Sequence, residues 1–210
     1  MARSFAILLA VIICCVYSGA SKGEDEGTFI VDFHTDIGSG GVISIEVNRS
    51  WAPLGADHFL ALVKDSFYNE CAFTRVVPNF VLQFGIAGIP SENVKWDKPI
   101  MDDPVVKSNT VGTITYATSG ANTRTTQLFI NYIDNSRLDA MGFAPFGRVI
   151  AGMDVASAVF NPTPGSSGGV DQNEYENKGN TWIRQAYPKI NFIVEATVRT
   201  TKTIGQRLAH

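Results

Sequence analysis

Apolar and polar residues alternate in several short segments of this chain, which is the pattern of β-strands that bury one face. The first two segments, residues 28–34 and 42–47, flank the sequence Gly-Ser-Gly-Gly at 38–41, where glycine tolerates a positive φ and favours a hairpin turn. Two more short strands are expected around Pro78. Later apolar segments complete a set of about eight strands, at 111–117, 127–132, 144–150 and 190–198.

Two segments have the periodicity of a helix. From Pro53 onward, apolar residues recur at intervals of three and four, and proline is favoured at the first helical position. Residues 153–160 predict a second, shorter helix. The stretches 86–110 and 162–180 are rich in glycine, proline and polar residues, so we expect long loops in both. Many short strands and few helices favour an antiparallel β-barrel or sandwich.

Composition agrees with one compact domain. Of the 210 residues 45% are hydrophobic and 18% are charged, which is ordinary for a globular protein. The formal net charge is −3 and no basic stripe is visible, so we expect no nucleic acid as a partner. We expect the domain to occupy residues 28–200, followed by a C-terminal tail at 201–210, and we expect a monomer.

The N-terminal residues have the features of a secretory signal peptide. Arg3 precedes an apolar run from Phe5 to Tyr17, which at 13 residues is short for a membrane-spanning helix. The small residues Ser18-Gly19-Ala20 then predict cleavage before Ser21. We therefore expect a signal peptide at 1–20 rather than a membrane anchor, then a flexible segment at 21–27, with no stable membrane insertion after processing. The protein would reach the secretory pathway, as a secreted or endomembrane-lumen protein, or the periplasm in a bacterium.

Cysteine and histidine suggest no metal chemistry. Cys14 and Cys15 would leave with the signal peptide, so Cys71 would remain as a single thiol that cannot form an internal disulfide. We expect it to be a small buried side chain. No metal or organic cofactor is predicted. Asn48-Arg49-Ser50 is a glycosylation sequon, usable in a eukaryotic secretory pathway.

Arg75 is the unusual residue of the pair of strands around Pro78. It lies in an otherwise apolar strand, and period-2 counting places it on the same face as Phe73 and Val77. Burying an unpaired guanidinium is costly, so Arg75 must face solvent or a wet cleft. Two interpretations follow: an exposed arginine on a strand, or a polar group in an apolar groove formed with Phe80 and Gln83.

The sequence from Phe73 to Gln83, Phe-x-Arg-Val-x-Pro-x-Phe-x-x-Gln, resembles the core signature of the cyclophilins, the peptidyl-prolyl cis–trans isomerases that cyclosporin inhibits. Two further blocks, at 112–130 and 138–155, are similar to later parts of that family in the same order. The resemblance covers roughly residues 28–198. It implies a mainly β fold: a closed eight-stranded antiparallel β-barrel capped by two α-helices, with a packed interior and the substrate groove on its outer face.

The resemblance also implies an activity, rotation about X-Pro peptide bonds without a cofactor, and a set of partners, proline-containing peptides and proteins. Its matching positions imply that Arg75, Phe80 and Gln83 are catalytic, with Arg75 donating a hydrogen bond to the prolyl nitrogen. They imply that the substrate is bound by Val81, Ala117, Thr118, Gln127, Phe129, Leu138 and Phe143. A non-catalytic module that binds proline-containing peptides, and a β-barrel carrier for a small apolar ligand, are the alternatives.

Four positions depart from the family pattern. Arg137 stands where many members have tryptophan, and Phe143 is the expected occupant where they have histidine. Thr118 replaces a common asparagine, and Gly85 is followed by Ile86 in place of the usual Gly-Asp continuation. The implied proline pocket survives these changes. Because the tryptophan is a principal contact of cyclosporin in the family, the resemblance implies isomerase activity with weakened cyclosporin affinity.

Overall fold

The computed structural model describes residues 27–199, so the predicted signal peptide at 1–20, residues 21–26 of the flexible segment and the tail at 201–210 lie outside the described residues. Nine antiparallel strands form one sheet in the order β3-β9-β1-β2-β8-β6-β7-β5-β4. The strands are β1 Thr28–Thr35, β2 Val42–Asn48, β3 Cys71–Ala72, β4 Arg75–Val77, β5 Val81–Phe84, β6 Thr113–Tyr116, β7 Leu128–Asn131, β8 Pro145–Ala151 and β9 Phe192–Arg199.

The mainly β prediction is confirmed, but the closed eight-stranded barrel is wrong. The sheet curls into a half-barrel of nine strands, and within residues 27–199 no strand pairing joins β3 to β4 at the two ends of the order. These edge strands are neighbours in the chain, separated by Phe73 and Thr74, so one bent segment supplies both edges. The bend also interrupts the period-2 pattern: Phe73 is fully buried in the core, whereas Arg75 is half-buried.

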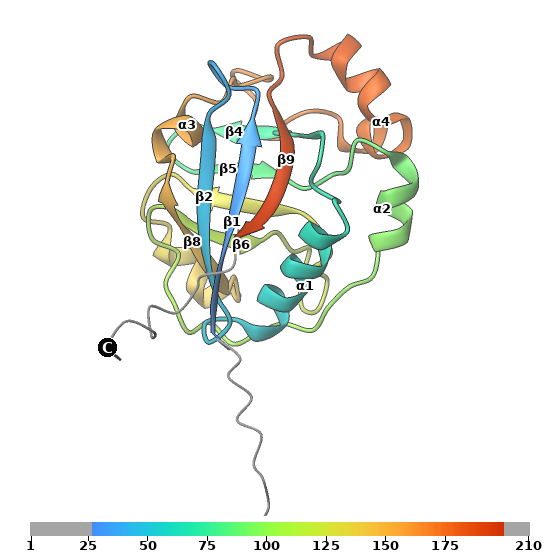
Figure 1. The fold of residues 1–210 in the computed structure, drawn as a ribbon. Helices are drawn as coiled ribbons and strands as arrows, with labels where there is room; N and C mark the ends of the chain where they lie inside the picture. Colours follow the sequence, from blue (N-terminus) through green and yellow to red (C-terminus); the bar gives the residue numbers. More distant parts are fainter. Residues whose placement is uncertain (1–26, 200–210) are drawn as a thin grey trace, which may run out of the picture.

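The expectation of two helices is also wrong for the described residues, which contain four α-helices and one 3-10 helix. The predicted helix at Pro53 is confirmed as α1, and the second predicted helix is shorter than expected, ending at Ser157. In Figure 1, α1, α2 and α4 lie at the right of the molecule and α3 at the left. The helices are α1 Pro53–Lys64, α2 Pro90–Trp96, α3 Met153–Ser157, α4 Gln172–Ala186 and the 3-10 helix η1 Ser136–Met141.

Helices α2 and α4 occupy segments that we expected to be loops. Pro90, counted as a helix breaker, is instead the first residue of α2, where proline is tolerated. Helix α4 is mostly polar and kinks at Gly179, whose φ is 62°, although it buries Tyr175 and Ile183. Its start does carry a signal, because the side chain of Asp171 accepts a hydrogen bond from the backbone N–H of Glu174 at 3.1 Å.

The N-terminus of α1 depends on a distant carboxylate. Ala52 precedes the helix and has no side chain that could cap it. Asp103 accepts hydrogen bonds from the backbone N–H groups of Leu54 at 3.0 Å and Gly55 at 2.8 Å. The same carboxylate pairs with the buried guanidinium of Arg124 at 3.1 Å. Asp103 lies in the segment before β6, and Arg124 lies in the segment before β7. The carboxylate of Asp103 therefore joins both segments to α1.

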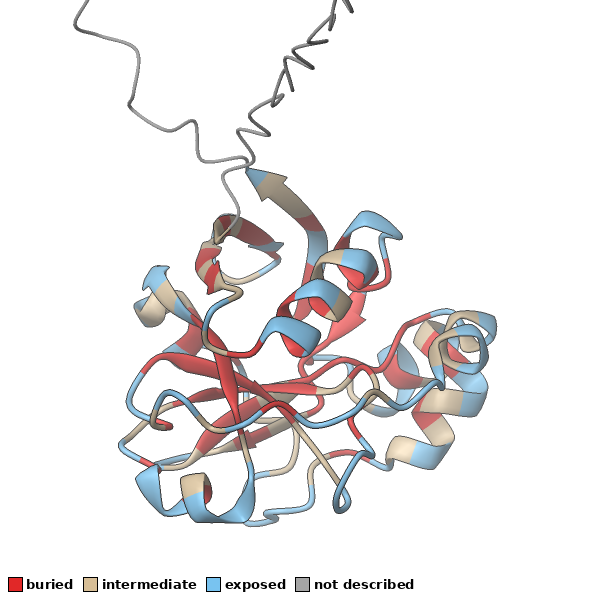
Figure 2. Ribbon diagram, turned by 90° about the horizontal axis from the view of Figure 1, so that it is seen from below, coloured by how far each residue is buried: buried red, intermediate tan, exposed pale blue. Residues whose placement is uncertain are grey.

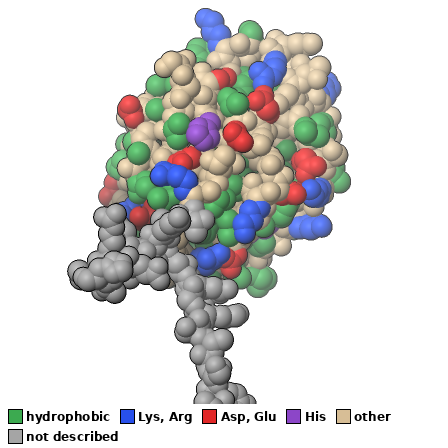
Figure 3. Space-filling model, viewed as in Figure 1, with side chains coloured by type: hydrophobic (Ala, Val, Ile, Leu, Met, Phe, Trp, Pro, Cys, Tyr) green, Lys and Arg blue, Asp and Glu red, His purple; other side chains and the backbone are tan. Residues whose placement is uncertain are grey.

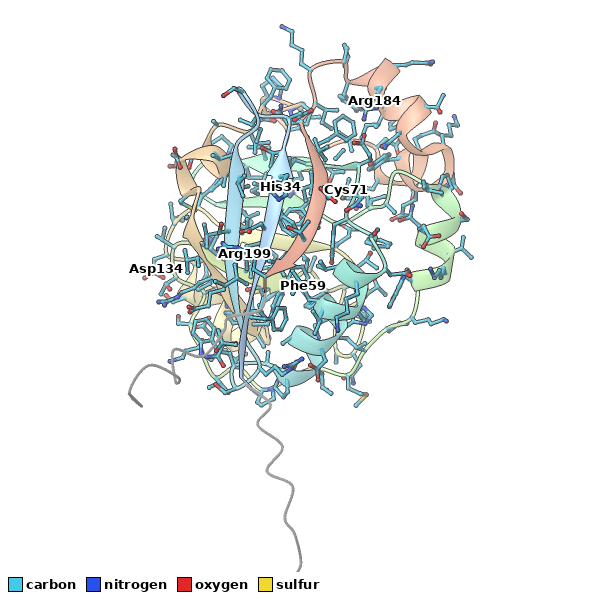
Figure 4. All side chains as sticks on the ribbon, viewed as in Figure 1. His34, Phe59, Cys71, Asp134, Arg184 and Arg199 are labelled. Atoms are coloured by element: carbon cyan, nitrogen blue, oxygen red, sulfur yellow. The ribbon has the colours of Figure 1, made fainter. Side chains whose placement is uncertain are left out.

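Aromatic rings fill the inside of the curled sheet. Phe33 of β1 lies 6.1 Å from Phe59 of α1, 5.8 Å from Tyr68 and 5.5 Å from Phe84 of β5, measured between ring centroids. Figure 2 shows buried residues along the strands, and in Figure 4 Phe59 lies where α1 meets the sheet. Cys71 is buried as predicted, and burial raises the pKa of its thiol to about 12.

The surface that carries β1, β2 and β9 mixes acidic, basic and apolar side chains without a field of one sign (Figure 3). Within residues 27–199, none of the helices has the length and apolar character needed to cross a lipid bilayer.

Candidate active site

The candidate site begins on the outer face of three neighbouring strands, β4, β5 and β7. Arg75 pairs with Gln83, and Gln83 pairs in turn with Phe129, so the three residues form one row across the sheet. Leu82 and Ile130, one position further along their strands, are fully buried in the core. Because side chains alternate between faces, the row of Arg75, Gln83 and Phe129 faces outward. The register of the strands thus brings together residues more than fifty positions apart.

This row lines a groove of about 320 Å³. All ten side chains predicted from the sequence line it: Arg75, Phe80, Val81, Gln83, Ala117, Thr118, Gln127, Phe129, Leu138 and Phe143. Four lining residues were missed: Ser119, Thr123, Thr125 and Gln172. The first three lie between two predicted strands, inside the block at 112–130 that is similar to the family. The position of that block could have indicated them. Gln172 begins a helix that the sequence did not predict.

The floor of the groove is an apolar cluster separate from the main core. Val81, Phe129 and Leu138 form it, with 2%, 5% and 7% of their surfaces exposed. The rings of Phe129 and Phe143 meet edge to face, with centroids 5.7 Å apart. These side chains are nearly buried yet open to the groove, so the floor can accept an apolar ring at little further desolvation cost.

Arg75 forms the polar wall of the groove. Its Nη1 donates a hydrogen bond to Oε1 of Gln83 at 2.9 Å, and its Nε donates to the backbone carbonyl of Ser167. Partial burial lowers the pKa of the guanidinium, but an arginine remains charged at neutral pH. Among residues 27–199 no carboxylate forms an ion pair with Arg75. The positive charge is therefore held in place without being neutralised.

Phe80 lies between two arginines. Its ring centroid is 5.8 Å from Cζ of Arg75 and 4.9 Å from Cζ of Arg137, distances at which a cation is attracted to an aromatic ring. Arg137 is exposed, at the edge of the groove. The backbone carbonyl of Phe80 accepts hydrogen bonds from Nδ2 of Asn135 at 3.0 Å and from the N–H of Tyr132 at 2.9 Å. The turn that carries Phe80 is thereby tied to the segment that follows β7.

Leu138 is held in the floor through its neighbour Asp139 in η1. The carboxylate of Asp139 accepts hydrogen bonds from Ser108 at 2.5 Å and from the backbone N–H of Asn109 at 2.9 Å. Burial alone would raise the pKa of Asp139, but these hydrogen bonds outweigh burial, and the pKa is lowered. Asn109 also donates to the carbonyl of Phe143 at 2.8 Å, which connects both ends of the floor to one buried polar group.

The rim of the groove is a hydroxyl-rich loop after β6. The hydroxyls of Thr118 and Thr123 lie 2.8 Å apart and hold the loop closed. The N–H of Ala117 donates to the carbonyl of Gln127 at 2.9 Å, so that N–H is already used within the protein. An extended peptide at this rim would have to pair with other backbone groups. Behind the rim, Nε2 of His58 lies 2.8 Å from the carbonyl of Thr125, and burial lowers the pKa of this histidine.

The arrangement can hold an apolar ring on its floor and offer a charged donor to an atom above that ring. Residues 27–199 contain no group of three or more His, Cys, Asp or Glu side chains placed to hold a metal ion. The two functions of the groove, apolar contact and hydrogen-bond donation, come from side chains alone.

Known proteins resemble this chain in sequence. Residues 30–180 match the family model described as cyclophilin type peptidyl-prolyl cis-trans isomerase/CLD. A peptidyl-prolyl cis-trans isomerase of Acinetobacter baylyi is 35% identical over 179 residues, covering 82% of this chain and 89% of that protein. The human peptidyl-prolyl cis-trans isomerase-like 3 is 35% identical over 128 residues, covering 59% of this chain and 77% of that protein.

A solved structure supports the fold. The crystal structure of a cyclophilin type peptidyl-prolyl cis-trans isomerase from Cryptosporidium parvum matches with a TM-score of 0.62 at 19% identity, covering 83% of this chain and 99% of that chain. At this identity the likeness concerns the fold alone.

Proposed function

The chain belongs to the cyclophilin-type peptidyl-prolyl cis–trans isomerases, and we propose that it isomerises X-Pro bonds in the Arg75 groove to assist the folding of exported proteins. Proline-containing peptides and proteins are the substrates of such isomerases. The part proposed here has two components: the roles of the groove residues, and the compartment in which the enzyme works.

The reaction needs stabilisation of a twisted amide. Resonance opposes rotation about the peptide C–N bond with a barrier of about 18–20 kcal/mol. At the twisted transition state the prolyl nitrogen loses conjugation and regains a localised lone pair. A hydrogen-bond donor aimed at that nitrogen binds the transition state more strongly than the planar ground state, which is the condition for catalysis. The twisted amide is also less polar than the planar one, so an apolar surrounding favours it.

Arg75 is placed to be that donor. The guanidinium has five N–H bonds, and hydrogen bonds to Gln83 and to the Ser167 carbonyl use two of them. Other N–H bonds remain available to a ligand. Because the guanidinium is fixed before the substrate arrives, little reorganisation is needed at the transition state.

The floor then holds the proline ring. Val81, Phe129 and Leu138 present apolar surface beside Arg75, and Phe143 and Phe80 close the two sides. A proline seated on this floor would bring its ring nitrogen to the Arg75 wall. One observation carries the proposal: the same groove holds a nearly buried apolar floor and a charged donor, Arg75, that forms no ion pair with a carboxylate of residues 27–199.

The compartment is proposed from the N-terminal sequence. Arg3, the apolar run from Phe5 to Tyr17 and Ser18-Gly19-Ala20 together have the composition of a cleavable secretory signal. The enzyme would therefore act on proteins folding in the secretory pathway or outside the cell, or in a bacterial periplasm.

The test of the compartment is the intact mass of the full chain expressed in a secreting host. We expect the exported fraction to begin at or near Ser21 and to accelerate cis–trans exchange in a short X-Pro peptide. A protein that stays in the cytosol with residues 1–20 attached would contradict the proposed location, while leaving the isomerase activity itself untouched.

A further inference from the structure

A chain of three side-chain amides extends from Arg75 to helix α4. Gln83 accepts from Nη1 of Arg75 and donates through its Nε2 to Oε1 of Gln127 at 2.8 Å. Gln127 donates in turn through its Nε2 to Oε1 of Gln172 at 3.1 Å. Arg75 and the three glutamines all line the groove. Gln172 is thus the far end of a hydrogen-bonded chain that begins at the proposed catalytic donor.

The direction of the hydrogen bonds in this chain is set at its two ends, by the donor Arg75 and by the acceptor Gln172. A guanidinium can only donate hydrogen bonds, so Gln83 must present its oxygen to Arg75 and its NH₂ group to Gln127. Gln127 must then present its oxygen to Gln83, which leaves its NH₂ group facing Gln172. That NH₂ group needs an acceptor, and Oε1 of Gln172 supplies it. Each amide therefore has one correct orientation, although an isolated amide can turn over.

The segment that leads into Gln172 is packed against Arg75. It is the first residue of α4, directly after Asp171, whose side chain caps the helix. Just before the cap, the N–H of Val170 donates to the carbonyl of Thr74 at 3.0 Å, next to Arg75. Gly169 lies so close that a Cβ there would come within 2.7 Å of Cβ of Arg75. The same segment supplies the Ser167 carbonyl that accepts from Nε of Arg75.

We propose that Gln172 is a positioning residue for Arg75, because its oxygen orients Gln127, which orients Gln83, which presents an acceptor to the guanidinium. The inference rests on the catalytic role proposed for Arg75. Without an acceptor at residue 172, Gln127 can turn over and offer its NH₂ group to Gln83. Gln83 would then have to turn as well, and its NH₂ group would face the donors of Arg75.

The test compares three variants in an isomerase assay with a short X-Pro peptide. Gln172→Leu removes the acceptor, and we expect kcat and kcat/KM to fall together by about three- to tenfold, the range for loss of one neutral hydrogen bond. Gln172→Glu keeps an acceptor and should recover most of that loss. Asn173→Leu, at the exposed neighbouring position of α4, is the control and should stay within about twofold of the unmodified enzyme.

A double-mutant cycle separates positioning from other roles. In a Gln83→Ala background the chain is already broken, so Gln172→Leu should have no further effect. The same fold loss in both backgrounds would show that Gln172 acts on its own, by touching substrate or supporting the fold, and would overturn the proposal. In nuclear magnetic resonance spectra, Gln172→Leu should shift the Nε–Hε signal of Arg75, and Asn173→Leu should not.

Arg75→Ala distinguishes the two levels of the proposal. If Arg75→Ala is strongly impaired while Gln172→Leu matches the unmodified enzyme, the positioning role of Gln172 is wrong and the role of Arg75 stands. If Arg75→Ala is fully active, the catalytic role of Arg75 is wrong, and the positioning role of Gln172 falls with it.

Discussion

Replacing Asp103 with alanine should destabilise the fold more than replacing any exposed aspartate. The carboxylate is 1% exposed and has two tasks: it accepts two backbone N–H groups at the start of α1, and it pairs with Arg124, which is 4% exposed. Removing it leaves a buried guanidinium whose remaining partners are the carboxylate of Asp102, 3.3 Å from Nε, and the backbone carbonyl of Met101. It also leaves the N-terminus of α1 without a side-chain cap.

The magnitude follows from the burial of the pair. Breaking a buried ion pair by removing one partner typically lowers the free energy of unfolding by about 3–5 kcal/mol. The lost helix cap, about 1 kcal/mol, is taken as part of that range. For a domain of this size, each kcal/mol lowers Tm by roughly 2–4 °C, so we expect a fall of about 6–20 °C. The assay is denaturant and thermal unfolding followed by circular dichroism.

Asp57→Ala is the matched control. Asp57 lies on α1 and pairs with Arg49, but its side chain is 61% exposed, so its removal should change the free energy of unfolding by about 1 kcal/mol or less. The double variant Asp103→Ala/Arg124→Met should be more stable than Asp103→Ala alone, because it removes a buried charge that has lost its buried carboxylate partner. Equal effects of Asp103→Ala and Asp57→Ala would refute this reasoning about burial.

Two further predictions concern the groove and its support. The unmodified protein should be inhibited weakly by cyclosporin, and Arg137→Trp should strengthen that inhibition by about 1–3 kcal/mol, the scale of burying one large side chain. Tight inhibition of the unmodified protein would show that the role given to Arg137 is wrong. His58 has a pKa lowered first by burial and then by Arg124, so its stabilising contribution is present above its ordinary value of 6.5 and is lost as pH falls below it. Relative to His58→Gln, the Tm of the unmodified protein should therefore fall as the pH drops below about 6.5, and a pH-independent Tm difference would contradict this.

Local sequence patterns predicted the parts of the fold whose causes are local. The hairpin of β1 and β2, helix α1 and the two strands around Pro78 all follow from alternation, helical periodicity and turn residues. The N–H of Phe80 donates a hydrogen bond to the carbonyl of Val77 at 3.0 Å, which closes the turn between β4 and β5. The groove strands were found for the same reason.

The parts that were missed depend on distant partners. The two-residue strand β3 is too short for a periodic pattern and exists because β9 pairs with it. Helix α4 buries Tyr175 and Ile183, but it is mostly polar and interrupted at Gly179, so its capping aspartate was its clearest signal. The Ser167 carbonyl reaches Arg75 across more than ninety residues, Gln172 reaches Gln127 across 45, and Asp103 reaches α1 across nearly fifty. Such contacts have no local signature in a sequence.

The most direct measurement is the rate of cis–trans exchange in a short X-Pro peptide, followed by magnetisation-exchange spectroscopy with unmodified protein, Arg75→Ala and Arg75→Lys. If the hydrogen bond to the prolyl nitrogen contributes about 2–4 kcal/mol, Arg75→Ala should lower kcat/KM by roughly 10²–10³-fold at an unchanged Tm. Lysine should rescue poorly, because an ammonium cannot reproduce the planar fork of donors. Exchange by the correctly folded Arg75→Ala variant at the rate of the unmodified protein would contradict the role of Arg75.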